Sequence, residues 1–185
     1  MPCTVLAILA KGAEELELVT VVNILRRGGA AVVIAGLNGL DPVKCSKDVV
    51  IVPDQELEKV KKDLYDMVFI PGGLEGAKAC AGSELVNEVL NRHYQNNKYI
   101  ATICAGPLSL INHGIARGSC VTSHPCIKEQ LVKEGYSYKE QPVCVDGRIC
   151  TSRGPGTALL FGLKLVEVLF GEEKYKEVCK PLMIP

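Results

Sequence analysis

The chain has 185 residues, of which 48% are hydrophobic and 23% are charged, as is usual for a folded globular protein. This length suffices for one hydrophobic core, and we expect a single domain over residues 1–185. The 21 acidic and 21 basic residues balance one another. Charge therefore gives no reason to expect nucleic acid or an anionic membrane surface as a partner, and small molecules or other proteins are favoured.

The nine cysteines are scattered along the chain without a Cys-x-x-Cys pair. This spacing argues against a disulfide framework and against a structural metal site, so no metal is expected. Free thiols are typical of a reducing compartment, and we expect a cytoplasmic protein, with the nucleus and the mitochondrion left open. The apolar run at residues 5–10 lacks the basic start of a signal peptide and is too short to span a bilayer.

The first 36 residues predict a βαβ unit, which implies parallel strands. A strand is expected over residues 4–10. An amphipathic helix follows over residues 14–27, and Gly28-Gly29 ends it. A second strand is expected over residues 31–36.

Strands and helices continue to alternate along the rest of the chain. In chain order we expect two short strands or a hairpin at 43–45 and 49–52, a helix at 57–62, a strand at 66–70, a helix at 83–95, a strand at 99–103, a helix after residue 107, a strand at 120–123, a helix at 127–133, a hairpin about Asp146-Gly147 and a closing helix at 156–170. This order predicts an α/β three-layer sandwich with a mostly parallel central sheet.

The most informative segment spans residues 99–107, where an apolar strand ends on Cys104 just before Gly106-Pro107 interrupts the extended pattern. Unpaired N–H groups at the start of a helix favour an anionic sulfur and lower a thiol pKa from roughly 8.5. Cys104 is therefore a candidate nucleophile in the thiolate form. The alternative is that Cys104 is one more small buried apolar residue.

Ligands of open parallel sheets bind beyond the carboxyl ends of the strands. In this sequence that rule selects residues 12–17, the glycine turn at 71–73, Cys104 and His124. Together these positions offer a carboxylate, backbone donors, a nucleophile and a histidine that could share one pocket. His124 also fits a simple turn residue before Pro125. The other two histidines, His93 and His113, lie near helix ends and are expected to be structural.

Three glutamates begin the first helix, where negative side chains are favoured by the helix dipole alone. Glu17 differs from Glu14 and Glu15 because helical spacing aligns it with Val21 and Ile24 on the apolar face. A carboxyl group on that face would lose solvent, and its pKa would rise. Glu17 could then stay protonated and donate a hydrogen bond to a thiolate.

Several motifs occur together in one order along the whole chain: Ala-Lys-Gly-Ala-Glu-Glu at 10–15, Glu17, Pro-Gly-Gly at 71–73, Ile-Cys-Ala-Gly-Pro at 103–107, His-Pro at 124–125 and Thr-Ser-Arg-Gly-Pro-Gly-Thr at 151–157. In these motifs the sequence resembles the DJ/PfpI (ThiJ) superfamily. The resemblance implies a flavodoxin-like fold, a homodimer, and Cys104 as the reactive nucleophile.

The same resemblance implies further roles for residues around that nucleophile. Glu17 would be its protonated hydrogen-bond partner, Gly73 and Ala105 would form an oxyanion site with their backbone N–H groups, and His124 would lie nearby. The rim of the site and of the dimer would include Glu14, Arg27, Lys47, Arg153, Gly154 and Pro155.

Three positions depart from patterns in that superfamily. Protease-like members place a histidine directly after the cysteine, where this chain has Ala105, so peptide hydrolysis is disfavoured. Lys47 stands where close relatives commonly carry arginine, and it lacks the planar fork of a guanidinium group. Val52 stands where they carry a second cysteine, which argues against a redox role at that position.

The resemblance implies a glyoxalase III or deglycase activity on small reactive carbonyl compounds, with no cofactor. On this hypothesis the Cys104 thiolate attacks the aldehyde of methylglyoxal or of a glyoxal adduct. The alternative is a non-enzymatic, chaperone-like redox sensor in oxidative stress, which responds through oxidation of Cys104 to a sulfinate. A structural dimer with an inert cysteine is the third hypothesis.

Overall fold

The computed structural model describes residues 3–184 and contains one seven-stranded sheet and two small two-stranded sheets. The strands of the main sheet are β1 (Thr4–Leu9), β2 (Ala31–Gly36), β5 (Gln55–Glu56), β6 (Met67–Ile70), β7 (Tyr99–Ile103), β10 (Val143–Asp146) and β11 (Ile149–Ser152). The small sheets pair β3 (Val43–Lys44) with β4 (Val50–Ile51), and β8 (Cys120–Val121) with β9 (Ser137–Tyr138).

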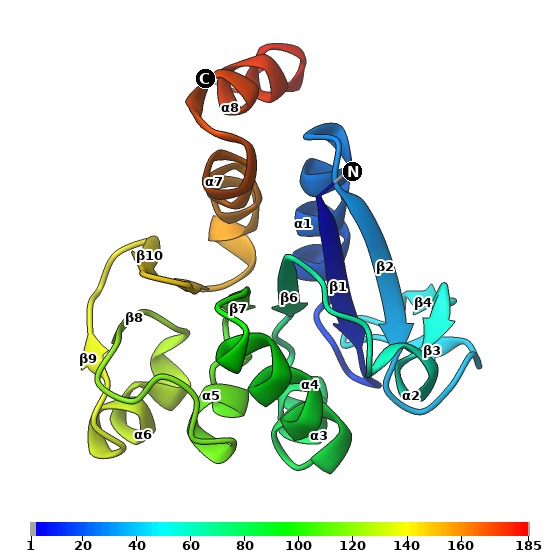
Figure 1. The fold of residues 1–185 in the computed structure, drawn as a ribbon, viewed down its shortest axis with the longest axis vertical. Coiled ribbons are helices and arrows are strands. Elements are labelled where there is room, and N and C mark those ends of the chain that lie inside the picture. The colour runs from blue at the N-terminus through cyan, green and yellow to red at the C-terminus, as the bar shows by residue number, and fades with distance from the viewer. Residues whose placement is uncertain (1–2, 185) are drawn as a thin grey trace.

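Helices lie on both faces of the main sheet (Figure 1). The α-helices are α1 (Glu15–Arg27), α2 (Leu57–Val60), α3 (Leu74–Ala81), α4 (Glu84–Gln95), α5 (Leu108–Asn112), α6 (Lys128–Lys133), α7 (Ala158–Phe170) and α8 (Glu172–Cys179). Short 3₁₀ turns occur at η1 (Pro125–Ile127), η2 (Pro155–Thr157) and η3 (Lys180–Leu182). None of the helices between residues 3 and 184 combines the length and the apolar character needed to cross a membrane.

The strand order in the main sheet is β10-β11-β7-β6-β1-β2-β5. Every neighbouring pair is parallel except the antiparallel β10–β11 hairpin. The parallel strands end on the same edge of the sheet, so the residues that follow β1, β6 and β7 meet there. The predicted α/β class with a mostly parallel sheet is confirmed.

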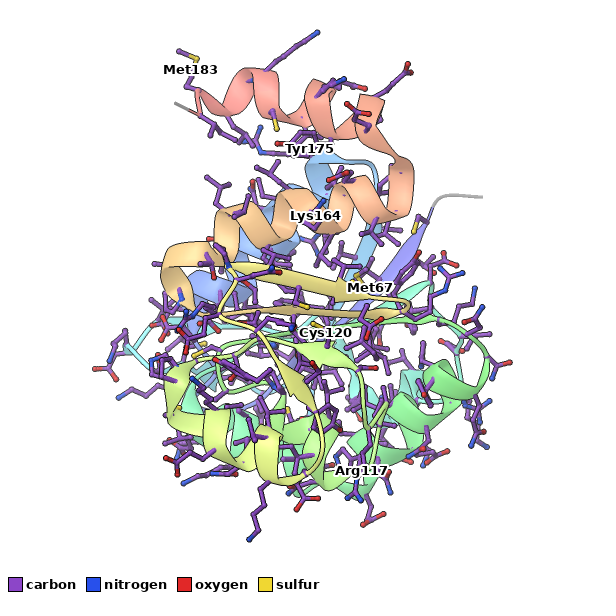
Figure 2. All side chains as sticks on the ribbon, turned by 90° about the vertical axis from the view of Figure 1, so that its left-hand side faces the viewer. Met67, Arg117, Cys120, Lys164, Tyr175 and Met183 are labelled. Carbon is purple, nitrogen blue, oxygen red and sulfur yellow. The ribbon has the colours of Figure 1, made fainter. Side chains whose placement is uncertain are left out.

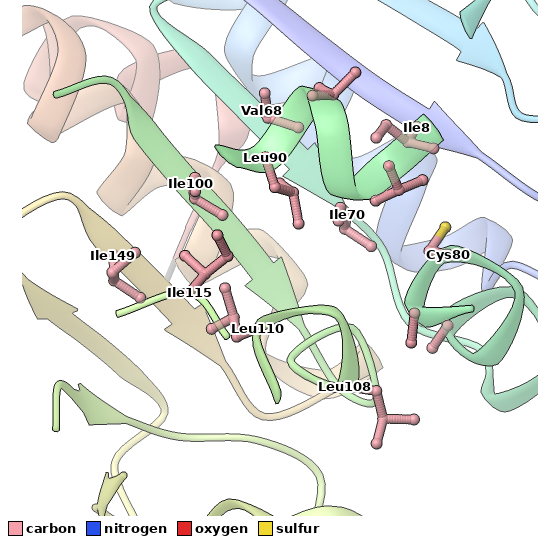
Figure 3. Close-up of a cluster of buried hydrophobic side chains, with 14 of the residues drawn as sticks. Ile8, Val68, Ile70, Cys80, Leu90, Ile100, Leu108, Leu110, Ile115 and Ile149 are labelled. Carbon is pink, nitrogen blue, oxygen red and sulfur yellow. The ribbon is translucent and has the colours of Figure 1, made fainter. Parts of the chain in front are cut away.

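Alternation along β1 explains the three layers, because successive side chains of a strand point to opposite faces. Leu6 and Ile8 pack with helices α2 to α6, in the apolar cluster drawn in Figure 3. Val5, Ala7 and Leu9 pack instead with α1, α7 and α8. Residues 5–9 of β1 are fully buried on both faces, which accounts for their unbroken apolar sequence.

Several elements differ from the sequence-based expectation, among them β8 and α3. The strand expected at residues 120–123 is only β8, and it pairs with β9 outside the main sheet. Helix α3 was not expected, because Gly76 in its middle weakens the helical pattern. The structure explains this glycine: a Cβ there would lie 2.7 Å from the backbone nitrogen of Ala13, so the close packing of α3 on residues 12–13 requires its absence.

Candidate active site

Cys104 follows β7 directly and adopts a left-handed backbone conformation, with φ of 62°. Its N–H donates to the Ser152 carbonyl at 3.0 Å, and its carbonyl accepts the N–H of His124 at 3.0 Å. The segments that carry Ser152 and His124 thus hold Cys104 in a backbone conformation that residues other than glycine rarely adopt. The side chain stays partly exposed.

The expectation that Cys104 lies at the start of a helix is wrong. Helix α5 begins only at Leu108, with Pro107 at its N-cap. Cys104 therefore lies outside the first turn, where the dipole effect is concentrated. The sulfur instead faces two individual backbone donors, the N–H groups of Gly73 and Ala105. These are the two groups expected to form the oxyanion site, and the structure brings both to the sulfur.

Glu17 lies on the buried face of α1, as predicted, and none of its surface is exposed. Its Oε2 accepts the backbone N–H of Gly72 at 2.7 Å, and the carboxyl group is hydrogen-bonded to the Cys104 thiol. Among residues 3–184, Oε1 has no hydrogen-bond partner. A buried carboxyl oxygen without a donor is costly when charged, so this environment favours a protonated Glu17.

The glycine turn at residues 72–73 makes the close approach possible. A Cβ on Gly72 would lie within 3.0 Å of both the Cys104 Cβ and Glu17 Oε2. Gly73 has φ of 80°, and a Cβ there would overlap the backbone of residues 12–14. The Glu14 N–H also donates to the Gly72 carbonyl at 3.0 Å, which attaches the start of α1 to this turn.

Burial is the largest influence on the pKa of both Glu17 and Cys104. Loss of solvent raises the pKa of Glu17 to about 7, against the opposing effect of the hydrogen bond from Gly72. Burial, followed by the charge of Glu17, raises the pKa of the Cys104 thiol to about 12, while the N–H groups of Gly73 and Ala105 lower it. The expectation of a lowered thiol pKa is therefore wrong, and burial of the sulfur is the largest cause.

His124 is exposed and forms the N-cap of η1, where its Nδ1 accepts the N–H of Cys126 at 3.2 Å. Its ring nevertheless faces the site. A Cβ built on Gly154 would lie 3.9 Å from the His124 ring and 4.0 Å from Glu17 Oε1. Gly154 thus lies between the His124 ring and the Glu17 carboxyl group. A larger residue at position 154 would fill part of the space between these two side chains.

The other expected rim residues lie in three places. Glu14 and Lys47 lie near the first turn of α1, where Glu14 accepts the Ser46 hydroxyl at 2.6 Å and Lys47 is exposed. Arg153 and Pro155 flank Gly154, and both reach solvent. Arg27 is at the far end of α1, roughly 15 Å along the helix from Glu17. Arg27 therefore lies outside the site around Cys104 in this chain.

Sequence reasoning missed three residues that shape the site. Gly72 holds Glu17, although the Pro-Gly-Gly turn was already singled out as a place to examine. Ser152 positions Cys104 through its carbonyl, for which the sequence carries no signal. Glu15 is buried and accepts the backbone N–H groups of Lys47 and Val49, so it fixes the β3–β4 hairpin against α1.

Within the described part of the chain, no group of three or more His, Cys, Asp or Glu side chains is placed to hold a metal ion. The site consists instead of a thiol, a buried carboxyl group and backbone donors. Such a set can form a covalent bond to an electrophile, stabilise a developing negative charge and move a proton.

The chain is similar over most of its length to known proteins. Residues 3–168 match the DJ-1/PfpI family. The chain is 49% identical to the Parkinson disease protein 7 homolog of Danio rerio over 181 residues, which cover 97% of this chain and 96% of that protein. It is 41% identical over 172 residues to the Caenorhabditis elegans protein named glutathione-independent glyoxalase DJR-1.2, covering 93% and 91%.

The crystal structure of Drosophila melanogaster DJ-1beta has the same flavodoxin-like fold. It matches with a TM-score of 0.97 and 47% sequence identity, and the match covers 100% of each chain. The agreement therefore extends through the elements that carry Glu17, Gly73, Cys104 and His124. On its sequence and its fold, the chain belongs to the DJ-1/PfpI family.

Proposed function

We propose that this chain is a cofactor-independent glyoxalase III or deglycase-type enzyme that acts on methylglyoxal and on glyoxal adducts. The observation that carries the proposal is the buried carboxyl group of Glu17 against the Cys104 sulfur. The C. elegans relative named as a glutathione-independent glyoxalase supports the class of substrate. A small reactive carbonyl compound supplies the electrophile that this pair requires.

The reactive state has one proton on Glu17 and none on Cys104. Two adjacent buried negative charges repel each other, so the pair carries a single charge near neutral pH. When Glu17 takes the proton, its repulsion of the thiolate ends and its O–H becomes a donor to the sulfur. Three donors, from Glu17, Gly73 and Ala105, then oppose the cost of burying the thiolate.

The first chemical step is attack of the Cys104 sulfur on the aldehyde carbon. A C–S bond forms, and the C=O π electrons become a negative charge on oxygen. The backbone donors of Gly73 and Ala105 stabilise this oxygen once the sulfur no longer carries the charge. Protonation by Glu17 completes a hemithioacetal and leaves Glu17 ionised.

Glu17 then acts as a base. It removes the proton from the former aldehyde carbon and returns it to the neighbouring carbon, while the hemithioacetal hydroxyl proton moves to the ketone oxygen. These two shifts convert the hemithioacetal of methylglyoxal into a hydroxy thioester. Water cleaves the thioester to give lactate and regenerates the thiol, or glycolate when glyoxal is the substrate. The net reaction adds one water and needs no external oxidant or reductant. On this proposal His124, across Gly154 from Glu17 Oε1, assists the water step, which its position near the site supports.

Peptide hydrolysis fits this site less well. An amide leaving group must be protonated as it departs, and a histidine next to the nucleophile usually does this. The residue after Cys104 is Ala105, and the His124 ring lies beyond Gly154. The geometry therefore favours aldehydes, which have no leaving group in the attack step.

A redox sensor is the second candidate function. It is favoured by the partial exposure of Cys104 together with its two backbone donors. Peroxide oxidises an accessible thiolate to a sulfenic and then a sulfinic acid. The N–H groups of Gly73 and Ala105 and a protonated Glu17 would stabilise the sulfinate oxygens. The same residues thus serve both functions.

We also propose that the chain forms a homodimer through α1 and the β3–β4 hairpin. Leu16 and Val19 on α1 are 49% and 53% exposed, and the hairpin adds the exposed Val50 and Val52. Glu15 joins the two elements through its bonds to the hairpin backbone, so the apolar residues form one face. Arg27 lies about three turns after Leu16 on the same side of α1, which gives it a place on the dimer rim.

Kinetics with methylglyoxal test the proposed enzyme directly. Cys104→Ser and Glu17→Gln should each lose nearly all turnover without glutathione, with folding checked by circular dichroism. Turnover close to that of the unmodified protein in either variant would remove that residue from the mechanism. If the unmodified protein itself shows no turnover, while mild peroxide oxidises Cys104 first among the nine cysteines, the sensor replaces the enzyme.

A further inference from the structure

We propose that Cys120 and Cys144 form a redox-active dithiol, which closes to a disulfide when the protein meets peroxide. Their sulfur atoms lie 3.2 Å apart, although the residues are 24 positions apart in sequence. The Cys144 thiol also contacts the carbonyl oxygen of Cys120 at 3.3 Å. Within residues 3–184, no other two cysteine sulfurs form a hydrogen-bonded pair.

The surrounding backbone holds the two sulfurs together. Cys120 lies in β8, which packs against β10, the strand that carries Cys144. The Cys120 N–H donates to Oδ2 of Asp146 at 2.7 Å, so the two strands are also tied through a side chain. Figure 2 shows Cys120 beside the β10–β11 hairpin. The S–S bond of about 2.0 Å requires only a small approach from the present separation.

The two thiols differ in their access to solvent, which assigns their roles. Cys120 is partly exposed, whereas Cys144 is buried, with 5% of its surface exposed. A peroxide molecule therefore reaches Cys120 first. Cys144 lies behind it, in position to react with the oxidised sulfur. This arrangement of an accessible cysteine beside a second, resolving cysteine is typical of redox sensors.

The chemistry needs only hydrogen peroxide as the oxidant. The Cys120 sulfur bonds to one peroxide oxygen, the O–O bond breaks, and the other oxygen leaves as water with the thiol proton. Cys120 is then a sulfenic acid. The Cys144 sulfur attacks the Cys120 sulfur, the S–O bond breaks, and a second water leaves with the Cys144 proton. The two thiols lose two electrons, and the peroxide gains them.

The disulfide would act on the segment that leads to the active site. From β8 the chain runs through Thr122 and Ser123 to His124, and the Thr122 N–H donates to the Thr151 hydroxyl at 2.8 Å. A covalent link from Cys120 to β10 restricts this segment at its start. It also restricts the unfolded chain, so the oxidised protein should melt at a higher temperature than the reduced protein.

The test uses the Cys104→Ser variant as its background, so that oxidation of the active-site sulfur cannot contribute. The protein is treated with one equivalent of hydrogen peroxide, blocked with an alkylating reagent and analysed by intact mass and non-reducing peptide mapping. We expect loss of two hydrogen atoms and a peptide pair that joins Cys120 to Cys144, both reversed by dithiothreitol. The Tm of the oxidised form should rise by several degrees.

Matched variants separate this dithiol from other thiols. Adding Cys120→Ala or Cys144→Ala should abolish the linked peptides, whereas adding Cys179→Ala, another partly exposed cysteine, should leave them unchanged. The proposal is overturned if the background protein gains oxygen or links other cysteines while Cys120 and Cys144 stay reduced. Because Cys104 is absent throughout, the result does not depend on the proposed enzymatic function.

Discussion

The backbone N–H of Gly72 donates to Oε2 of Glu17 at 2.7 Å, and this bond holds the buried carboxyl group against the Cys104 thiol. The other carboxyl oxygen, Oε1, has no partner among residues 3–184 and faces Gly154. Oε2 thus positions the carboxyl group, and the lack of a donor to Oε1 favours the protonated form of Glu17. The proposed nucleophile and the proposed proton carrier are therefore held together by a turn that only glycine can form.

Replacing Glu17 with glutamine tests its role as the proton carrier. Glutamine keeps the shape and an oxygen for the Gly72 N–H, but it cannot take up or release a proton in this reaction. General acid–base catalysis contributes about 10²–10⁴-fold, so kcat with methylglyoxal should fall by at least about 10²-fold. Glu84→Gln, in the first turn of α4, is the control and should keep full activity. A Glu17→Gln variant with unreduced kcat would contradict the mechanism.

Adding one methyl group at Gly72 should disrupt the site. In Gly72→Ala the new Cβ would lie within 3.0 Å of both Glu17 Oε2 and the Cys104 Cβ, so the pair must separate. A displacement of about 1 Å can cost about 10²-fold in rate, and we expect at least this loss of kcat/KM. Gly156→Ala is the matched control, because nothing lies within 4 Å of its Cβ position. Equal activities of the two variants would show that the close approach has no importance.

The raised pKa of Glu17 predicts how stability depends on pH. Burial raises this pKa from 4.5 to about 7, so the folded protein keeps a proton that the unfolded chain releases. The contribution is complete below the unfolded pKa and is lost as the pH rises through the folded pKa. Between about pH 5 and pH 8, the free energy of unfolding should therefore fall by on the order of 3 kcal/mol.

Urea unfolding of the wild-type protein and of Glu17→Gln measures this dependence. The variant has no titrating group at position 17, so its stability should fall less over the same pH interval. The difference between the two slopes isolates Glu17 from the other titrating groups. Parallel slopes would mean that the Glu17 carboxyl group has the same pKa in the folded and the unfolded protein, and Glu17 would then not hold a proton near neutral pH.

Charge on the exposed face of α1 tests the proposed dimer. Val19→Asp places a carboxylate within the apolar face and should shift the protein to monomers in analytical ultracentrifugation, because an unpaired charge is costly in an interface. Val132→Asp on α6 is a matched control, since both valines are 53% exposed. Retention of the dimer by Val19→Asp, or its loss in Val132→Asp, would show that another face is used.

Local patterns in the sequence predicted the elements that depend on local signals. Ser83 was expected to start α4, and its hydroxyl accepts the Val86 N–H at 3.4 Å. Asp146-Gly147 was expected to form a hairpin, and Gly147 has the positive φ that such a turn needs. The closing helix at 156–170 corresponds to α7, but α8 after Gly171 was missed because it buries only Val178.

Sequence patterns singled out residues that the structure brings together around Cys104, but they did not predict the pKa of its thiol. Helical spacing identified the buried glutamate, because its position relative to Val21 is a local property. The pKa of Cys104 depends on how deeply distant segments bury the sulfur, which no local pattern contains. The pairing of Cys120 with Cys144 likewise depends on the packing of β8 on β10. The expectation of one domain over residues 1–185 stays a prediction.

The most direct measurement is the rate of alkylation of Cys104 as a function of pH, with the alkylated residue identified by peptide mass. If Glu17 holds the shared proton, the thiolate is present near neutral pH, and the rate should already be high well below the ordinary thiol pKa of roughly 8.5. A rate that stays low until strongly alkaline pH would show that the proton resides on the sulfur. In that case Cys104 would not be the nucleophile of this protein.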